Sequence, residues 1–185
     1  MSTYLGATKS ITTEDIDANI IKESKLLYLE GYLWDEGEPK KAFEKAISNA
    51  NKVAMSLSDL FCVERHKPHF LDLVKNKLNI TFANEQEIMS LIDAKKFEEV
   101  INFAREMNKL IVITRGDKGA IAVNKNEIIE CSAKKNLQIK DLTGAGDLFA
   151  SGFLHGLINN KSVKESLETG AEMSSRVIQI IGARL

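Results

Sequence analysis

Short apolar runs alternate with longer segments of helical periodicity along most of the chain. The apolar runs, each bounded by polar residues, predict strands at 25–30, 53–57, 79–83 and 110–114. Apolar residues at helical spacing predict helices at 39–49, 67–78 and 85–107, the last of them broken by polar residues near 93–95. Strands that alternate with helices in this way are typical of a parallel sheet covered by helices.

The second half of the chain departs from this alternation. Two apolar runs, 119–123 and 127–131, flank Asn124-Lys125-Asn126 and predict a β-hairpin added to one side of the sheet. A further strand candidate at 137–140 precedes helices at 147–158 and 163–180. Because no linker or repeat divides the 185 residues, we expect one domain, 1–185, with a three-layer α/β architecture and an antiparallel edge.

Charge and cysteine content narrow the class of protein. The chain has 25 basic and 26 acidic residues without a basic block, which argues against a nucleic-acid partner. Cys62 and Cys131 are the only cysteines and stand far apart, so we expect reduced thiols rather than a disulfide or a metal site. The chain has no signal-peptide pattern and no apolar stretch that approaches ~18 residues, so we expect a soluble cytoplasmic protein without membrane contact.

A glycine-rich turn at 143–147 is the first candidate for chemistry. Gly144 and Gly146 allow a tight turn and a close backbone approach, and the free N–H groups of the helix that follows favour an anion. Asp147 would repel a bound phosphate, so it needs a further reason to stand there. It is either a general base for phosphoryl transfer or an ordinary acidic residue in the first turn of a helix.

Two common nucleotide-binding loops do not fit this turn. Phe149 stands where a dinucleotide-binding loop needs its third glycine, and the chain contains no P-loop sequence. Within the helix that follows, Gly152 and Gly156 would cost stability unless a neighbouring element packs closely against them. We therefore expect a tightly packed helix there and neither a Rossmann nor a P-loop nucleotide site.

Two other loops carry polar groups at strand ends. Thr114, Gly116 and Gly119 belong to a segment that leaves an apolar strand, so it is either a phosphate-binding loop or a plain turn. Asn84 and Glu87 begin a helix, where Glu87 could hold Mg²⁺ through water or simply complement the helix dipole. All three loops follow predicted strands of one sheet, so we expect them to gather along one edge.

Residues 141–153 resemble the C-terminal signature of the ribokinase family, also called the phosphofructokinase-B family of carbohydrate and nucleoside kinases. The resemblance implies that Gly144, Ala145 and Gly146 form an anion hole, with Thr143 beside the nucleotide. It implies that Asp147 deprotonates the acceptor hydroxyl. In some members of the family, Asp141 and the last loop also help to hold a potassium ion.

The resemblance extends to the other two loops. Asn84-x-x-Glu87 is similar to the family element that orders Mg²⁺ and phosphate, and Thr114-x-Gly116-x-x-Gly119 resembles the ATP-phosphate loop. Segments 28–34 and 56–62 look like adenosine-kinase-like and sugar-kinase members, and the ending from 170 to 184 resembles the last helix and loop, beside the adenine. The implied cofactors are ATP and Mg²⁺, with potassium as a further candidate.

The chain departs from the family pattern in two respects. Leu142 replaces the Thr that commonly follows the first Asp of the signature. The Gly-Gly element, the lid strands and most acceptor-binding side chains of the family's N-terminal part have no counterpart, and residues 1–7 resemble a segment that follows the lid. We therefore expect the later part of a ribokinase-like fold, from a truncated gene product, an internal start or one piece of a longer kinase.

The resemblance predicts a kinase that transfers the γ-phosphoryl group of ATP to a hydroxyl of a sugar or nucleoside, adenosine included. One alternative is a catalytically silent nucleotide-binding remnant, because the acceptor half has no counterpart in the chain. Another is a kinase of a vitamin precursor such as a hydroxymethylpyrimidine. A homodimer is left open as the assembly.

Overall fold

The computed structural model describes residues 6–34 and 37–185 and contains a six-stranded sheet. Residues 1–5 of the segment that resembles a post-lid sequence lie outside the described residues. The strands are β1 (Leu27–Glu30), β2 (Val53–Ser56), β3 (Ile80–Asn84), β4 (Leu110–Thr114), β5 (Ala120–Val123) and β6 (Ile128–Cys131). The α-helices are α1 (Ala18–Glu23), α2 (Glu38–Asn49), α3 (Leu60–Asp72), α4 (Glu85–Leu91), α5 (Phe97–Glu106), α6 (Ala145–Ile158) and α7 (Val163–Val177).

The strands lie in the sheet in the order in which they occur along the chain. Strands β1 to β4 are parallel, and β4, β5 and β6 are antiparallel. The predicted mostly parallel sheet with an antiparallel hairpin at its edge is therefore confirmed. In the register of β3 and β4, Asn84 is opposite Thr114, so two of the three predicted loops leave the sheet side by side.

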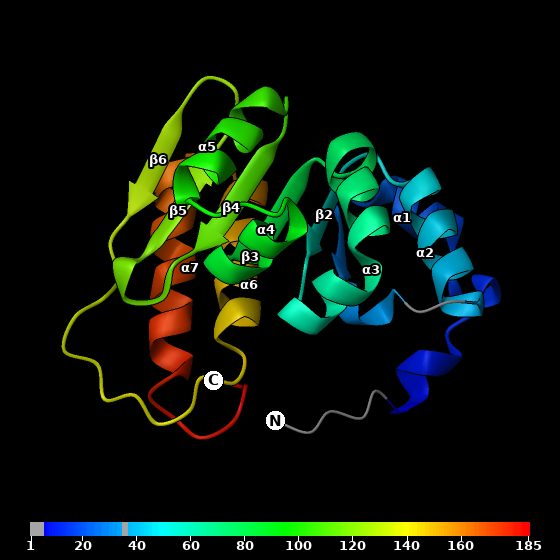
Figure 1. The fold of residues 1–185 in the computed structure, drawn as a ribbon. Coiled ribbons are helices and arrows are strands. Elements are labelled where there is room, and N and C mark those ends of the chain that lie inside the picture. Colours follow the sequence, from blue (N-terminus) through cyan, green and yellow to red (C-terminus); the bar gives the residue numbers. More distant parts are fainter. Residues whose placement is uncertain (1–5, 35–36) are drawn as a thin grey trace.

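Helices cover both faces of the sheet, which gives the three layers expected. In Figure 1, α3, α4 and α5 lie in front of the sheet, and α6 and α7 lie behind it. Alternate residues of β3 serve the two layers, because Ala83 belongs to the core under α3, α4 and α5 while Ile80 and Phe82 belong to the core under α6. Each layer thus has its own hydrophobic core.

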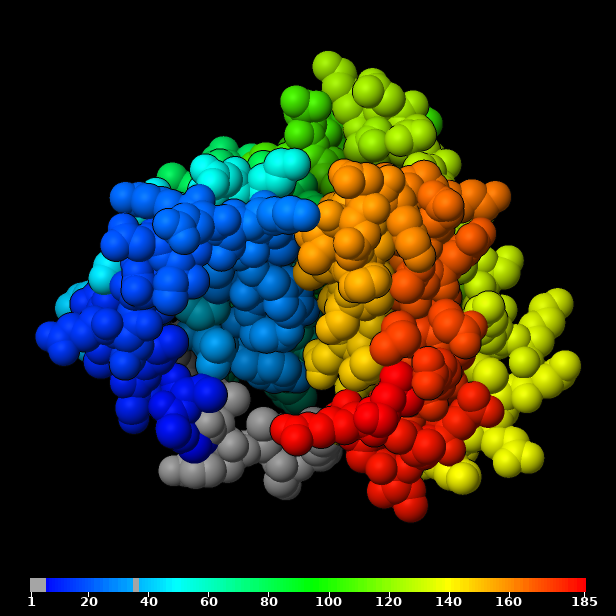
Figure 2. All heavy atoms as spheres, turned by 180° about the vertical axis from the view of Figure 1, so that it is seen from behind, coloured from blue at the N-terminus to red at the C-terminus, as the bar shows by residue number. Residues whose placement is uncertain are grey.

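The layer of α6 and α7 is held by aromatic contacts and by glycines. Phe153 of α6 packs edge-on against Phe82, with ring centroids 5.4 Å apart. A Cβ at Gly152 would lie 2.8 Å from the Thr169 carbonyl oxygen, and one at Gly170 would lie 2.7 Å from that of Phe149. The predicted close packing of α6 is confirmed, and Figure 2 shows this layer from behind, beside the segment that holds α1 and β1.

One predicted strand is wrong, and the bounds of the predicted helices differ, by at most two residues for α2 and α6 and by more for the other three. Residues 137–140 form no strand; Ile139 is 63% exposed, and the Lys140 N–H donates to the Ile178 carbonyl at 2.8 Å instead of to a sheet. Helix α3 begins at Leu60 rather than 67, because Asp59 caps it by accepting from the Cys62 N–H at 2.7 Å.

The predicted helix at 85–107 is two helices, as the polar break suggested, and the last helix ends at Val177 rather than 180. Helix α1 was not predicted; Asp17 caps it by accepting from the Asn19 N–H at 2.8 Å. No helix within 6–34 and 37–185 is long and apolar enough to cross a membrane. Over the same ranges, Cys62 and Cys131 form no disulfide, as expected.

Candidate functional site

The glycine-rich turn leads directly into α6. Gly144 adopts a left-handed conformation, φ 79° and ψ 2°, immediately before the helix begins at Ala145. A Cβ at Gly144 would lie 2.8 Å from the Cβ of Ala183, so both its conformation and its surroundings require glycine. No side chain caps this helix end; the Ala145 N–H donates to the Leu142 carbonyl at 3.2 Å, and the N–H groups of Gly146 and Asp147 remain available to an anion.

Asp141 fixes the turn to the end of the chain. Its Oδ1 accepts a hydrogen bond from the Thr143 N–H at 2.9 Å, and its Oδ2 accepts one from the Gly182 N–H at 3.0 Å. These two bonds hold the pKa of Asp141 below its usual range. The Asp141 carboxylate therefore connects the C-terminal segment to the glycine-rich turn by hydrogen bonds.

Asn84 and Glu87 form a capping box at the start of α4. The Asn84 side chain accepts from the Glu87 N–H at 2.9 Å, and the Glu87 carboxylate accepts from the Asn84 N–H at 2.9 Å and from its Nδ2 at 2.6 Å. Glu87 is only 5% exposed, and burial raises its pKa to about 7, with nearby Asp59 and Glu30 contributing. A cation close to this buried carboxyl group would lower its pKa and favour the carboxylate.

The turn between β4 and β5 carries two basic side chains. Arg115 Nε lies 2.8 Å from Glu85 Oε2, and Lys118 Nζ lies 3.7 Å from Glu85 Oε1. Gly119 has φ 92°, and a Cβ there would lie 2.0 Å from the Cys131 carbonyl oxygen, so only glycine fits. Glu85 thus joins the start of α4 to this turn, in agreement with the register of Asn84 and Thr114.

Glu30 lies near enough to Asp147 to feel its charge, and Ser58 is hydrogen-bonded to Glu30; the sequence assigned neither residue to the site. The Ser58 hydroxyl donates to Glu30 Oε2 at 3.2 Å, and Ser58 has φ 72°, a rare conformation outside glycine. Burial, together with the charge of Asp147, raises the pKa of Glu30. The one available signal was an acid at the carboxyl end of a short apolar strand, the edge of an α/β sheet where ligands bind.

A cavity of about 540 Å³ opens between the β4–β5 turn, the coil 132–144, the start of α6 and the end of α7; we call it the loop cavity. Five of the residues predicted for the site line it: Thr114, Gly116, Gly119, Ala145 and Gly146. The other six predicted residues are not part of its wall: Asn84, Glu87, Asp141, Thr143, Gly144 and Asp147. Asp147 is exposed in the first turn of α6. The structure therefore brings the glycine-rich segments together and leaves the acids beside them.

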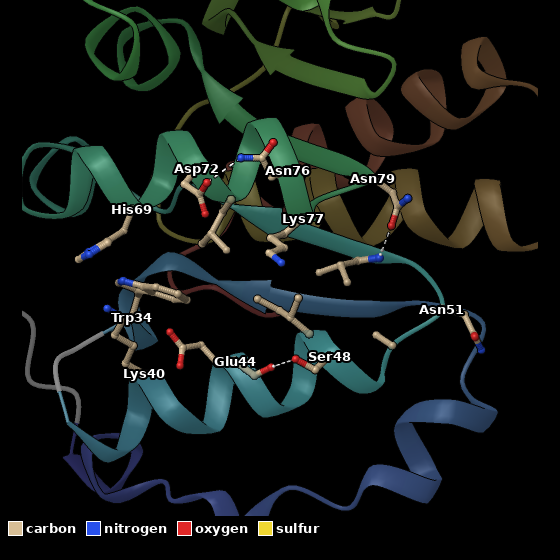
Figure 3. Close-up of a pocket in the computed structure, with 14 residues that line it drawn as sticks. Trp34, Lys40, Glu44, Ser48, Asn51, His69, Asp72, Asn76, Lys77 and Asn79 are labelled. Atoms are coloured by element: carbon tan, nitrogen blue, oxygen red, sulfur yellow. Dashed lines mark hydrogen bonds between the residues drawn. The ribbon is translucent and has the colours of Figure 1, made fainter.

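A larger cavity, of about 640 Å³, lies between α2 and α3 (Figure 3). Its wall includes Trp34, Lys40, Glu44 and His69, and none of the residues predicted for the site. Asn79 in this wall accepts from the Val53 N–H at 2.7 Å, and Trp34 packs edge-on against Phe43. The loop cavity is the better candidate, because it lies between the N-terminus of α6 and the β4–β5 turn with its two glycines.

The chain is similar in sequence to carbohydrate kinases. A family model described as pfkB family carbohydrate kinase matches residues 1–185. The 5-dehydro-2-deoxygluconokinase of Listeria monocytogenes is 26% identical over 179 residues, which cover 91% of this chain and 55% of that protein.

Two solved structures are similar in fold. The adenosine kinase from Sinorhizobium meliloti superposes with a TM-score of 0.93 at 36% identity and covers 98% of this chain and 57% of its own. A putative ribokinase II from E. coli in complex with ATP and Mg²⁺ has a TM-score of 0.83 at 18% identity, covering 94% and 58%. The chain thus spans somewhat more than half the length of these proteins.

Proposed function

The chain belongs to the pfkB family of carbohydrate kinases, and from that premise we propose that it takes part in transferring the γ-phosphoryl group of ATP to a hydroxyl of a sugar or nucleoside. The observation that carries the proposal is the start of α6, which has no side-chain cap and whose residues Ala145 and Gly146 line the same cavity as Gly116 and Gly119. Backbone N–H groups at a helix N-terminus suit the developing charge of phosphoryl transfer.

Asp147 is the proposed general base. The acceptor hydroxyl would give its proton to the Asp147 carboxylate as its oxygen bonds to the γ-phosphorus, and the bond to the β-phosphate oxygen would break to release ADP. Gly144, Ala145 and Gly146 would hold the transferred group, with Thr143 beside them. Exposure of Asp147 in the first turn of α6 supports this role, since an acceptor can reach it.

The β4–β5 turn would bind the other phosphates of the nucleotide. Thr114, Gly116 and Gly119 line the same cavity as the start of α6, and Arg115 and Lys118 supply positive charge nearby. In the described residues, no group of three or more His, Cys, Asp or Glu side chains could by itself hold a metal ion. A magnesium ion carried by ATP phosphates and waters needs fewer protein ligands.

Glu87 fits such a magnesium ion through water. Both of its oxygens already accept hydrogen bonds from Asn84, which favours contact through water over direct ligation. Bound magnesium would neutralise the charge that the phosphates bring to the site. Asp141 and the last loop would hold potassium in the same proposal, and its test is turnover in potassium chloride against choline chloride.

The names of the relatives suggest the acceptor class. The Listeria relative is named for a sugar acid derivative and the Sinorhizobium structure for adenosine, so the proposed acceptors are small polyhydroxy compounds. We also propose a cytoplasmic location, supported by two cysteines without a disulfide in the described chain. A homodimer stays a prediction that light scattering would test.

The proposal is tested by phosphate transfer from ATP to a panel of sugars and nucleosides. Asp147→Asn should lower turnover by ~10² to 10⁴ and keep nucleotide affinity within a few-fold, because the base acts on the acceptor. Glu98→Gln removes another exposed acid from the first turn of a helix, α5, and should leave turnover unchanged. Binding of ATP without transfer to any acceptor would favour the silent nucleotide-binding alternative.

A further inference from the structure

Arg115 is held by contacts on two sides at the start of the β4–β5 turn. Its Nε lies 2.8 Å from Glu85 Oε2, at the start of α4, and its guanidinium carbon lies 3.9 Å from the centroid of the Phe97 ring, at the start of α5. The Arg115 and Glu85 side chains are only 21% and 26% exposed, so salt screens this ion pair less than one on the open surface. We call Glu85, Arg115 and Phe97 the Arg115 cluster. It joins the turn to the first residues of two helices.

The Arg115 side chain lies outside the loop cavity. Its two neighbours in sequence, Thr114 and Gly116, both line the cavity, whereas Arg115 does not. The backbone of Arg115 belongs to the turn itself, because its N–H donates to the Gly119 carbonyl at 2.8 Å and its carbonyl accepts from the Lys118 N–H at 3.2 Å. The guanidinium is thus engaged with α4 and α5, while the main chain of the same residue shapes the turn proposed to bind phosphates.

Glu85 connects the Arg115 cluster to the proposed magnesium element. It lies in the first turn of α4, directly after Asn84 and two positions before Glu87, which together form the capping box of that helix. Asn84 is also opposite Thr114, where the pairing of β3 with β4 ends. Beyond the paired strands, the side chains of the Arg115 cluster continue the connection between the two loops.

We propose that Arg115 is a positioning residue, which sets the distance between the β4–β5 turn and the Asn84–Glu87 element so that one magnesium–nucleotide complex contacts both. This inference rests on the proposed function, in which the turn binds phosphates and Glu87 meets magnesium through water. Magnesium lies at a nearly fixed distance from the phosphates that it binds, because its octahedral ligand bonds are about 2.1 Å long. A turn displaced by about 1 Å from Glu87 therefore cannot satisfy both contacts, and a misplacement of that size can lower a rate by on the order of 10²-fold.

The experiment is calorimetric titration of the chain with ADP, once with Mg²⁺ and once with EDTA in its place. Arg115→Met removes the charge and keeps an unbranched side chain against Phe97. It should weaken ADP binding about tenfold with Mg²⁺, as the loss of a partner behind a metal ligand does. In EDTA the loss should be less than about threefold, because the turn alone still meets the phosphates.

The outcomes separate this inference from the proposed function. Equal weakening with Mg²⁺ and in EDTA would overturn the inference, because it would indicate a direct phosphate contact or a general loss of structure. Unchanged binding in Arg115→Met would also overturn it, as would a parent chain whose ADP affinity Mg²⁺ does not raise. Failure of the parent chain to bind ADP in either condition would contradict the proposed function itself.

A double-mutant cycle tests whether Arg115 acts through Glu85. Glu85→Gln should lower the enhancement of ADP binding by Mg²⁺ to a similar extent as Arg115→Met. The two changes together should add less than about twofold to either loss, because both break one interaction. Fully additive losses would overturn the inference.

Lys67→Met is the matched control. Lys67 Nζ lies 2.5 Å from Asp93 Oδ1, and the Lys67 side chain is 28% exposed, so this variant also removes a partly buried ion pair. Neither residue belongs to the loops of the proposed site. Lys67→Met should lower the melting temperature about as much as Arg115→Met and leave the enhancement by Mg²⁺ unchanged. A loss of enhancement as large as in Arg115→Met would overturn the inference.

Discussion

The carboxylate of Asp141 accepts a hydrogen bond from the backbone N–H of Gly182, with Oδ2 and N 3.0 Å apart. The bond joins the start of the signature segment to the last residues of the chain and brings Ala183 against Gly144. In Figure 1 the C-terminal end accordingly lies below the start of α6. The geometry of the glycine-rich turn therefore depends on residues that a motif search would not include.

Asp141→Asn should destabilise the protein at neutral pH and weaken nucleotide binding. Hydrogen bonds from Thr143 and Gly182 lower the pKa of Asp141 in the folded protein. The ionised carboxylate therefore stabilises the fold at a pH above the usual Asp pKa, about 3.9. This contribution is lost as the pH falls through the lower pKa of the folded state. The difference in melting temperature between variant and parent should be largest at pH 7 and shrink below about pH 4.

Asp15→Asn is the matched control for this prediction. Hydrogen bonds from Thr12 also lower the pKa of Asp15, but this residue lies outside the loop cavity. It should reproduce the pH-dependent loss of stability without changing nucleotide affinity. Equal losses of nucleotide affinity in both variants would contradict a specific role of Asp141.

Glu87→Gln should flatten the dependence of stability on pH between about 5 and 8. Burial raises the pKa of Glu87 to about 7, so its protonated form stabilises the fold at low pH and that contribution is lost as the pH rises through about 7. Removing the ionisable group should remove a slope worth on the order of 2 kcal/mol, measured by urea unfolding at pH 5.5 and 8.

The neighbouring acid Glu85 provides a control of opposite sign. A hydrogen bond from Arg115 lowers the pKa of Glu85, so its stabilisation is present at neutral pH and is lost in acid. Glu85→Gln should therefore lower stability by a similar amount across pH 5 to 8, which leaves the slope in that range unchanged, and its difference from the parent should shrink at lower pH. A slope that persists in Glu87→Gln would show that another group titrates in this range.

Gly146→Ala should raise the stability of the protein and lower its affinity for nucleotide. Gly146 lies in the first turn of α6 without a positive φ, and a Cβ there would meet nothing within 4 Å. Alanine should therefore stabilise the helix by about 0.5 to 1 kcal/mol. The same methyl group projects where Gly146 lines the loop cavity, so nucleotide affinity should fall, as calorimetry would measure. An unchanged affinity would exclude Gly146 from the phosphate site.

Gly170→Ala should destabilise the protein without adding any group to the loop cavity. The new Cβ would lie 2.7 Å from the Phe149 carbonyl oxygen, and backbone atoms at that distance must move apart. We expect a loss of about 1 to 3 kcal/mol in the free energy of unfolding, from overpacking. Gly146→Ala is again the comparison, because it makes the same chemical change in a helix that has room for it.

The sequence was sufficient to predict the sheet and its order of elements. Parallel β1 to β4 and the hairpin of β5 and β6 followed from short apolar runs, because β2 to β5 are buried on both faces of the sheet. The grouping of Thr114, Gly116 and Gly119 with Gly146 followed from their positions after strands or before a helix. These features depend on local pattern, and local pattern is what a single sequence records.

The parts that escaped prediction depend on contacts between distant residues. The run at 137–140 has the composition of a strand, but its partner is the Ile178 carbonyl, and Ile139 faces a cavity rather than a core. Glu30 and Ser58 meet across 28 positions of sequence, and only the parallel pairing of β1 with β2 brings them together. Composition cannot distinguish such residues from ordinary strand ends.

Gly152 and Gly170 lie where α6 packs against α7. Substitutions at these glycines should be poorly tolerated even though they lie away from the proposed site. An added Cβ at Gly152 or Gly170 would meet a backbone oxygen at 2.8 or 2.7 Å, so a larger side chain there would push α6 and α7 apart. A displacement there would be carried along α6 to Asp147 as a rigid movement, whereas exposed side chains of the coil can change without moving it. In a complete substitution scan, these buried positions should be as intolerant as the proposed base.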